Sequence, residues 1–359
     1  MTAFPKRTDV FVVGGGPAGL AAAIAARLKG FDVVVADAAR PPIDKSCGEG
    51  LMPDSFSALR RLGVRLDGQP CFPFRGIRFH GASVSVAATF PGERGVGIRR
   101  THLHAALIDR ARELGVTMLW GTRVNSLSSD AVLLDGGAVK CGWMIGADGQ
   151  NSRVRLWAEL DAARHESERY GFRRHYRVAP WTDYMEIHWG SGCQMYVTPV
   201  SAQEICAAVI SRDSHLRFDH ALPWFPELHR RLRAAPPSTF ERGSVTASRR
   251  LRKVFSGRVV LIGDASGSVD AITGEGLSLS FHQALAAVDA LVSEDLAAYQ
   301  TEHRRLARRP AFMAGLMLLL DRFPWLLAPA LRAMAFEPAI FAKLLAVHAG
   351  ETSPALAVW

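Results

Sequence analysis

The chain has 359 residues, of which 48% are hydrophobic, and a formal net charge of +9. This length suffices for two domains or for one large α/β unit with an embedded second module. The five cysteines form no Cys-x-x-Cys pair and no cluster with histidine, so neither a disulfide framework nor a metal site is expected. Basic residues are spread along the chain rather than gathered in one tract, which argues against a nucleic-acid partner.

The first pattern is an apolar strand over Asp9–Val13, followed directly by a glycine-rich turn and a helix over Leu20–Leu28. The turn has Gly-x-Gly-x-x-Gly spacing, which lets a pyrophosphate approach the N–H groups and the positive dipole end of a helix. A second apolar strand, Val33–Ala36, ends in an acid about 20 residues beyond the glycines, where a ribose hydroxyl is bound. These patterns predict a dinucleotide site formed by Gly14, Gly16, Pro17, Ala18, Gly19 and Asp37.

Further elements follow before the middle of the chain. In order, the patterns predict a loop over Pro41–Pro53, an amphipathic helix over Ser55–Leu62, antiparallel strands from Pro70 to Gly97, a helix over Arg100–Leu114, and a strand pair around Val116–Trp120 and Val132–Leu134.

An apolar strand followed by glycine occurs twice more, at Gly146-Ala147-Asp148-Gly149 and at Gly263-Asp264-Ala265. Residues 165 to 249 alternate like an antiparallel sheet, and a helix is predicted from Leu277 to Val292. Together the three glycine motifs indicate bound FAD in a discontinuous domain. We expect an α/β fold: a three-layer, Rossmann-like FAD-binding domain with a parallel sheet (1–65, 96–160 and 250–300), an inserted antiparallel β-sheet substrate domain (66–95 and 161–249) and a C-terminal helical segment (301–359).

The C-terminal segment combines four arginines with the apolar run Pro310–Leu320, and Pro324 and Pro338 begin further short apolar helices. Eleven residues are too few to cross a bilayer, which takes about 20. Core packing explains such a segment, and peripheral membrane contact through these helices is the alternative. The first strand leaves no room for a signal peptide, so the expected location is cytoplasmic or membrane-peripheral.

The chain resembles FAD-dependent oxidoreductases of the p-hydroxybenzoate-hydroxylase type, and within them the geranylgeranyl-reductase-like branch. The resemblance rests on the three glycine motifs in order and on Arg100-Thr101-His102-Leu103, similar to an Arg-x-x-Leu cofactor contact. Two segments resemble the reductase branch, namely the loop Lys45–Pro53 and the turn Ile272–Gly276. The resemblance implies FAD, NAD(P)H as a transient electron donor, and cofactor contacts by Cys47, Gly48, Arg100, Asp148, Gly149, Asp264, Gly274, Glu275 and Gly276.

The resemblance also implies that the helix after Gly276 points its N-terminus at the flavin, so that backbone N–H groups of residues 274–276 stabilise the reduced, anionic ring. For Glu275 a structural role and a proton-transfer role stay open. Cys47 is the candidate catalytic residue, as a proton donor or as a side chain that shapes the substrate cavity. Its alternative is a small buried hydrophobic residue.

The leading hypothesis is an NAD(P)H- and O2-dependent monooxygenase that hydroxylates a lipophilic aromatic or polyketide-like intermediate. It is favoured because Tyr196-Val197-Thr198-Pro199 stands where the isoprenoid reductases have an aromatic Trp-x-Phe-Pro element. The alternative is a flavin-dependent ene-reductase of isoprenoid or polyenyl chains, and a non-enzymatic binding module is a third class. A small lipophilic substrate is expected, and the oligomeric state is left open.

Overall fold

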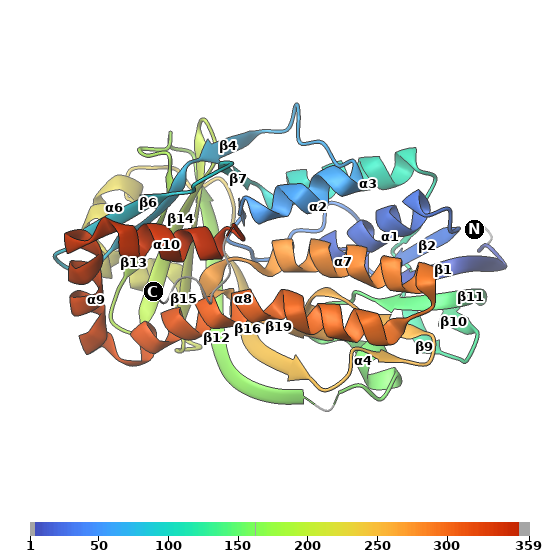
Figure 1. Ribbon diagram of the computed structural model, residues 1–359. Helices are drawn as coiled ribbons and strands as arrows, with labels where there is room; N and C mark the ends of the chain where they lie inside the picture. Colours follow the sequence, from blue (N-terminus) through green and yellow to red (C-terminus); the bar gives the residue numbers. More distant parts are fainter. Residues whose placement is uncertain (1–3, 162, 352–359) are drawn as a thin grey trace.

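The computed structural model of the chain describes residues 4–161 and 163–351, and for residues 163–167 it describes the backbone alone. Two large sheets with their helices lie side by side, and the chain passes between them several times (Figure 1). The α/β fold with a parallel sheet, an antiparallel sheet and C-terminal helices is therefore confirmed. The boundaries given above for the domains stay a prediction.

The first sheet is built on the strands that carry the glycine motifs. β1 (Arg7–Val13) lies parallel to β2 (Val33–Asp37) on one side and to β11 (Gly137–Gly146) on the other. β8 (Thr117–Trp120) and β18 (Val259–Leu261) extend the sheet in parallel. Central strands of this kind are covered on both faces, which explains why β1 and β2 are apolar along most of their length.

The remaining strands of this sheet are antiparallel. β9 (Val124–Leu127) pairs with β10 (Ala131–Leu134), β10 pairs with β11, and β17 (Phe255–Ser256) pairs with β18. The predicted pairing of Val116–Trp120 with Val132–Leu134 is wrong, although both segments form strands. β8 follows a helix, and a helical crossover returns the chain parallel to the sheet, whereas the short loop before β10 makes a hairpin.

Helices form a layer over the first sheet (Figure 1). α1 (Pro17–Leu28) packs against α3 (Arg100–Glu113) and α7 (Gly276–Ser293), and α2 (Asp54–Leu62) and α8 (Leu296–Arg322) pack against α7. The alanine-rich sequence of α1 is buried along most of its length, since small side chains let it lie between the sheet and α7.

The second sheet stands at the other end of the molecule. Its order is β19 (Gly267–Ser268), β16 (Arg242–Leu251), β12 (Ala163–Tyr176), β15 (Glu204–Ser211), β14 (Cys193–Ser201), β13 (Tyr184–Trp189), β5 (Gly76–His80) and β6 (Ser85–Thr89). Neighbours are antiparallel as predicted, except that β13 runs parallel to β5. A small third sheet joins β3 (Gly50–Leu51), β7 (Gly95–Ile98) and β4 (Cys71–Phe74).

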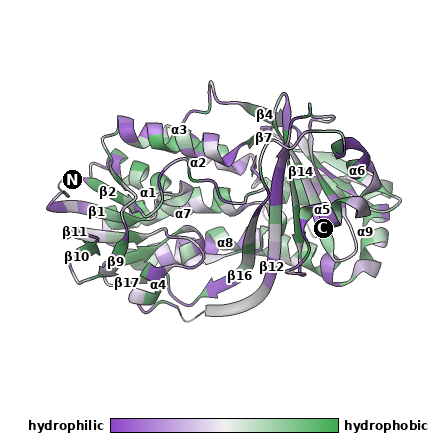
Figure 2. Ribbon diagram, turned by 180° about the vertical axis from the view of Figure 1, so that it is seen from behind, coloured by the Kyte–Doolittle hydropathy of each residue, from purple (hydrophilic) through white to green (hydrophobic). Residues whose placement is uncertain are grey.

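Successive side chains of these strands point to opposite faces of the second sheet, and both faces carry apolar clusters. The inner face, with Met185 and Ile187, packs against α8, α9 (Pro324–Phe336) and α10 (Pro338–His348). The outer face carries a separate apolar cluster beneath the short helices α5 (Phe218–Ala221) and α6 (Pro226–Leu232). In Figure 2 the segment labelled α9 is mainly green, the colour of hydrophobic residues.

The predicted apolar run after Pro310 is the second half of α8, which continues through the proline as one helix. Among the helices of residues 4–161 and 163–351, none alone has the length and hydropathy to cross a bilayer. Only α8 and α9 taken together reach that hydropathy, and they meet at a bend of 119°.

Candidate functional site

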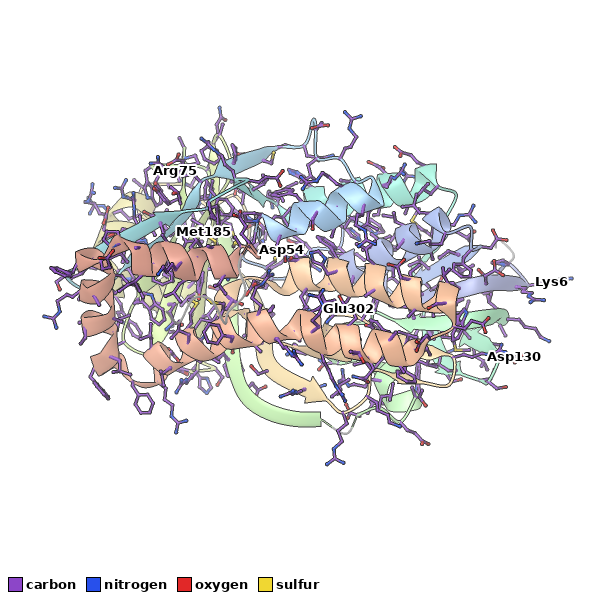
Figure 3. The ribbon with its side chains drawn as sticks, viewed as in Figure 1. Lys6, Asp54, Arg75, Asp130, Met185 and Glu302 are labelled. Atoms are coloured by element: carbon purple, nitrogen blue, oxygen red, sulfur yellow. The ribbon has the colours of Figure 1, made fainter. Side chains whose placement is uncertain are left out.

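A cavity of about 710 Å³ lies at the junction of the two sheets. Met185 on β13 and Asp54 at the start of α2 mark this junction in Figure 3. The cavity is lined by nearly every residue that the sequence predicts to contact a cofactor, with Gly19 and Glu275 as the two exceptions. These lining residues are Gly14, Gly16, Pro17, Ala18, Asp37, Cys47, Gly48, Arg100, Asp148, Gly149, Asp264, Gly274 and Gly276.

The start of α1 is shaped for an anion. No side chain caps this helix in the part of the chain that the structure describes, so its first N–H groups are available. A Cβ at Gly16 would meet no described protein atom within 4 Å, which means that it would project into open cavity. Two other glycines shape the turn itself. Gly14 has a φ of 108°, and a Cβ at Gly19 would lie 1.8 Å from the Gly14 carbonyl oxygen. The residues therefore fit a pyrophosphate.

Asp37 closes this end of the cavity at the tip of β2. Its Oδ2 accepts a hydrogen bond from the Gly15 N–H (2.7 Å), and its Oδ1 accepts one from the Ala39 N–H (2.8 Å). His104 on α3 also holds the glycine turn, with Nε2 donating to the Gly15 carbonyl (2.7 Å). Burial lowers the pKa of His104 despite this bond. Sequence reasoning gave His104 no role, because a single histidine on a helix has no distinguishing pattern.

The carboxylate of Asp148 is used within the chain. It accepts hydrogen bonds from the Ser152 hydroxyl and from the N–H groups of Arg153 and Val154, at the start of α4 (Arg153–Trp157). Gly149 has a φ of 82°. The Asp-Gly motif therefore fixes a loop conformation at the cavity wall. By contrast, Asp264 is half-exposed at the cavity, 3.4 Å from the Nζ of Lys45.

Arg100 begins α3 and lines the cavity. Its backbone N–H donates to Glu49 Oε1 (3.0 Å), while its buried Nε has no hydrogen-bond partner among the described residues. A buried guanidinium nitrogen without a hydrogen-bond partner lowers the stability of the protein when no ligand is bound. It fits a bound group that supplies an acceptor at this point, as a dinucleotide would.

The start of α7 is a second helix N-terminus at the cavity. Within the described chain it has no side-chain cap, and a Cβ at Gly276 would meet no atom within 4 Å. The Gly274 N–H donates to the Ala271 carbonyl (3.0 Å), so the expectation that all three amides of residues 274–276 face a flavin is wrong for that one. The free amides at this helix start fit a ligand with developing negative charge.

The side chain of Glu275 does not line the cavity, and the contact of this residue with a cofactor stays a prediction. That side chain is buried away from the cavity, and its oxygens lie 3.3 Å from Arg309 Nη2 on α8 and 3.3 Å from His348 Nδ1 on α10. Arg309 and His348 come from helices far along the sequence, and both lie beside the carboxylate. Glu275 therefore ties the C-terminal helices to the helix start at the cavity.

The opposite wall of the cavity belongs to the inner face of the second sheet. Met185, Tyr196 and Ile210 line it, and Cys47 lies on the loop that crosses between the two walls. Tyr196 donates its hydroxyl to the Ile272 carbonyl (2.8 Å), and burial raises its pKa. The register of β13 and β14 thus decides which side chains of these strands reach the cavity.

Buried charges on β12 were missed by the sequence analysis. Arg169 pairs with Asp270 (3.4 Å) and also hydrogen-bonds Gln194, whereas Arg173 pairs with Asp44 (2.5 Å). Gly171, between the two arginines, lines the cavity. The two arginines are four positions apart and so share one face of the strand, which was the available signal, but charged residues in a strand are normally assigned to its solvent face.

Two groups of side chains bring three potential metal ligands together among the described residues: Glu49, His175 and Cys206, and His80, Glu186 and His188. An arginine accompanies each group, since Arg173 lies 3.9 Å from Glu49 and Arg78 lies 3.7 Å from Glu186. Burial alone would raise the pKa of Glu186, but hydrogen bonds from His188, His80 and Trp181 lower it. Hydrogen bonds from His175 to Glu49, and from His80 and Trp181 to Glu186, engage the carboxylate of each group. The expectation of no metal stays a prediction.

Comparison with curated proteins gives relatives of two kinds. A menaquinone reductase of Mycolicibacterium smegmatis is 29% identical over 358 residues, which cover 88% of this chain and 86% of that protein. The FAD-dependent monooxygenase OpS4 of Beauveria bassiana is 34% identical over 170 residues, which cover 42% of this chain and 40% of that protein.

Solved structures share the fold. The flavin-dependent brominase Bmp2 superposes with a TM-score of 0.83 at 19% identity, over 98% of this chain and 97% of that one. A geranylgeranyl bacteriochlorophyll reductase-like protein from Thermoplasma acidophilum gives a TM-score of 0.76 at 20% identity, over 89% and 88% of the two chains. The model of the FAD binding domain family matches residues 7–305. With the cavity fitting a dinucleotide at three glycine motifs, the chain belongs to the FAD binding domain family and is a flavin-dependent oxidoreductase.

Proposed function

We propose that this protein is an FAD-dependent reductase that saturates a carbon–carbon double bond in the polyprenyl side chain of a lipophilic quinone. The observation that carries the proposal is the likeness to a menaquinone reductase over 88% of the chain. The monooxygenase OpS4 matches 42% of the chain, so the similarity favours the ene-reductase over the monooxygenase that the sequence analysis ranked first.

The cavity supports this reaction. When bound and reduced by a donor such as NAD(P)H, FAD supplies a hydride to one carbon of the double bond, and a proton must reach the other carbon. Apolar side chains of the second sheet, including Met185 and Ile210, offer a dry wall for an isoprenoid chain. The Tyr196 hydroxyl at this wall already donates to Ile272, and we propose the thiol of Cys47, on the loop that crosses between the walls, as the proton donor.

A membrane-dissolved substrate suits the C-terminal helices. α9 carries Arg332 as its one charged residue and exposes Trp325 (71%) and Phe336 (91%) on the surface. Its other face packs through Leu331 and Met334 into the apolar cluster that includes Met185 at the cavity. We propose that this exposed face of α9 rests in the interfacial layer of an anionic membrane, where tryptophan and arginine are favoured.

The proposed reaction is tested by product mass. The purified flavoprotein is incubated with NAD(P)H and a polyprenyl quinone, once under nitrogen and once in air. A product that gains two hydrogens under nitrogen supports the proposal. A product that gains one oxygen, and forms in air alone, would establish the monooxygenase instead, and this second candidate rests on the monooxygenase relatives.

Flotation with anionic liposomes tests the membrane contact. The variant Trp325→Ser/Phe336→Ser should lose flotation, while Phe240→Ser should keep it, because Phe240 is at least as exposed (94%) but lies on the loop before β16 and not on a C-terminal helix. Flotation of both variants alike, or of neither the wild type nor the variants, would contradict a role for α9.

A further inference from the structure

Glu49 is one of several residues by which the loop between β2 and α2 contacts the second sheet. Its side chain is buried (2% exposed), and its backbone is left-handed with a φ of 60°, which is unfavourable for a residue with a side chain. Cys47, two residues earlier, and Arg100, at the start of α3, both line the cavity. Glu49 therefore stands where the flavin domain and the substrate wall meet.

Each polar group of Glu49 is engaged. Oε1 accepts from the Arg100 N–H (3.0 Å), and Oε2 lies 2.6 Å from Nε2 of His175 on β12. The Glu49 N–H donates to Cys47 Sγ (3.4 Å), and its carbonyl accepts from the Ile98 N–H (3.0 Å). One side chain thus joins the Cys47 loop, the start of α3 and the second sheet.

The direction of the bond between His175 and Glu49 follows from the neighbours on the other side of the ring. Two groups lie near His175 Nδ1, namely Thr239 Oγ1 (2.9 Å) and Arg173 Nη1 (3.1 Å). A guanidinium can only donate, and the Thr239 oxygen already accepts the His175 backbone N–H (3.2 Å), which leaves its own hydroxyl proton to donate. Both neighbours therefore favour an Nδ1 that accepts. Nε2 then carries a proton, which it donates to Glu49 Oε2. Burial would lower the pKa of Arg173, but Glu49, Cys206 and Asp44 raise it, which keeps this donor charged.

We propose that Glu49 is a positioning residue, held by a one-way chain of hydrogen bonds from Arg173 through His175, and that it sets the places of Cys47 and Arg100 at the cavity. The inference deepens the proposed function, since it concerns the same site, but it requires only that FAD binds there. A carboxylate is needed because both oxygens must accept, one from a backbone amide and one from a ring whose tautomer Arg173 fixes.

The variant Glu49→Gln tests the direction of these hydrogen bonds. In this variant the amide NH2 group faces either the His175 Nε2–H or the Arg100 N–H. In both orientations one donor meets another donor, and one of the two hydrogen bonds is lost. We expect the FAD dissociation constant to rise about 10-fold and the flavin absorbance bands to shift. Arg173→Gln frees Nδ1 to take the ring proton, so Nε2 can then accept from the new amide NH2. The effect of Glu49→Gln should therefore be several-fold smaller in the Arg173→Gln background than in the wild type.

The matched controls are Glu241→Gln and Arg174→Gln. Arg174 is the next residue of β12, and it pairs with Asp219 (2.6 Å) and Glu241 (3.8 Å) outside the cavity lining. Both controls should retain FAD affinity and flavin spectrum. If Glu49→Gln has the same effect in both backgrounds, or if the controls shift the flavin bands equally, the proposal is overturned.

Two further measurements keep the test decisive if Glu49→Gln does not fold. Nitrogen-15 NMR of labelled histidine should place the His175 proton on Nε2, and a proton on Nδ1 would refute the chain of bonds. His175→Gln offers one acceptor and one donor and should bind FAD like the wild type, whereas His175→Leu should not; equal binding by both would also refute it. None of these readouts uses the substrate, so failure of the proposed reaction would be seen separately.

Discussion

Two glycines of the first motif, three positions apart, should respond differently to the same added methyl group. Gly16 has extended backbone angles (φ −73°, ψ −179°) that alanine adopts freely, and its Cβ would enter the cavity without meeting a described protein atom within 4 Å. Gly19 has no such room, since its Cβ would lie 1.8 Å from the Gly14 carbonyl oxygen and 3.2 Å from Val12 Cγ1. Gly16→Ala therefore probes the ligand, and Gly19→Ala probes the fold.

The magnitudes follow from these contacts. In the apoprotein, Gly16→Ala restricts the unfolded chain, which stabilises by about 0.4–1 kcal/mol, and weakens the start of α1 by a similar amount. The free energy of unfolding should thus change by less than about 1 kcal/mol. Loss of one charge-assisted hydrogen bond to a pyrophosphate costs about 1.5–3 kcal/mol, or roughly 10- to 100-fold in FAD affinity. Gly19→Ala forces α1 away from β1 and should destabilise the apoprotein by about 1–3 kcal/mol.

Urea unfolding of the apoproteins gives the first quantity, and fluorescence titration with FAD gives the second. The reasoning fails if Gly16→Ala destabilises the apoprotein as much as Gly19→Ala does. It also fails if Gly16→Ala binds FAD with wild-type affinity, because the pyrophosphate would then lie elsewhere.

Three further predictions concern the proton donor, the C-terminal helices and the response to acid. Cys47→Ser should retain FAD and lower turnover by about 100-fold, and unchanged steady-state kinetics would remove the thiol from the mechanism. Arg309→Met should lower the free energy of unfolding by about 2 kcal/mol, because buried Glu275 and partly buried Asp54 both lose a cation; a loss below about 0.5 kcal/mol in urea denaturation would contradict this. Burial lowers the pKa of His303 to about 4, so between about pH 6.5 and 4 the unfolded chain binds a proton that the folded chain does not. The free energy of unfolding should therefore decrease as the pH is lowered through that window, by at most about 3 kcal/mol. In His303→Gln, the free energy of unfolding measured by urea denaturation should depend less on pH over the same range.

Local sequence determined the cofactor half of this protein. A strand, a glycine turn and a helix follow each other within a few residues around Gly14, and a glycine turn leads directly into a helix at Gly276. The steric reasons for glycine there are also local, since Gly16 and Gly276 lie at the first turn of their own helices. For that reason most predicted cofactor residues line one cavity.

The substrate half was decided by tertiary structure. Glu49 and His175 are 126 positions apart, and Glu275 finds its partners on helices that begin at Leu296 and Pro338. A buried charge is stable only beside its partner, and the sequence shows the charge without showing which strand or helix will bring that partner. Register likewise chose which side chains of β13 and β14 face the cavity, because a shift of one residue turns every side chain to the other face.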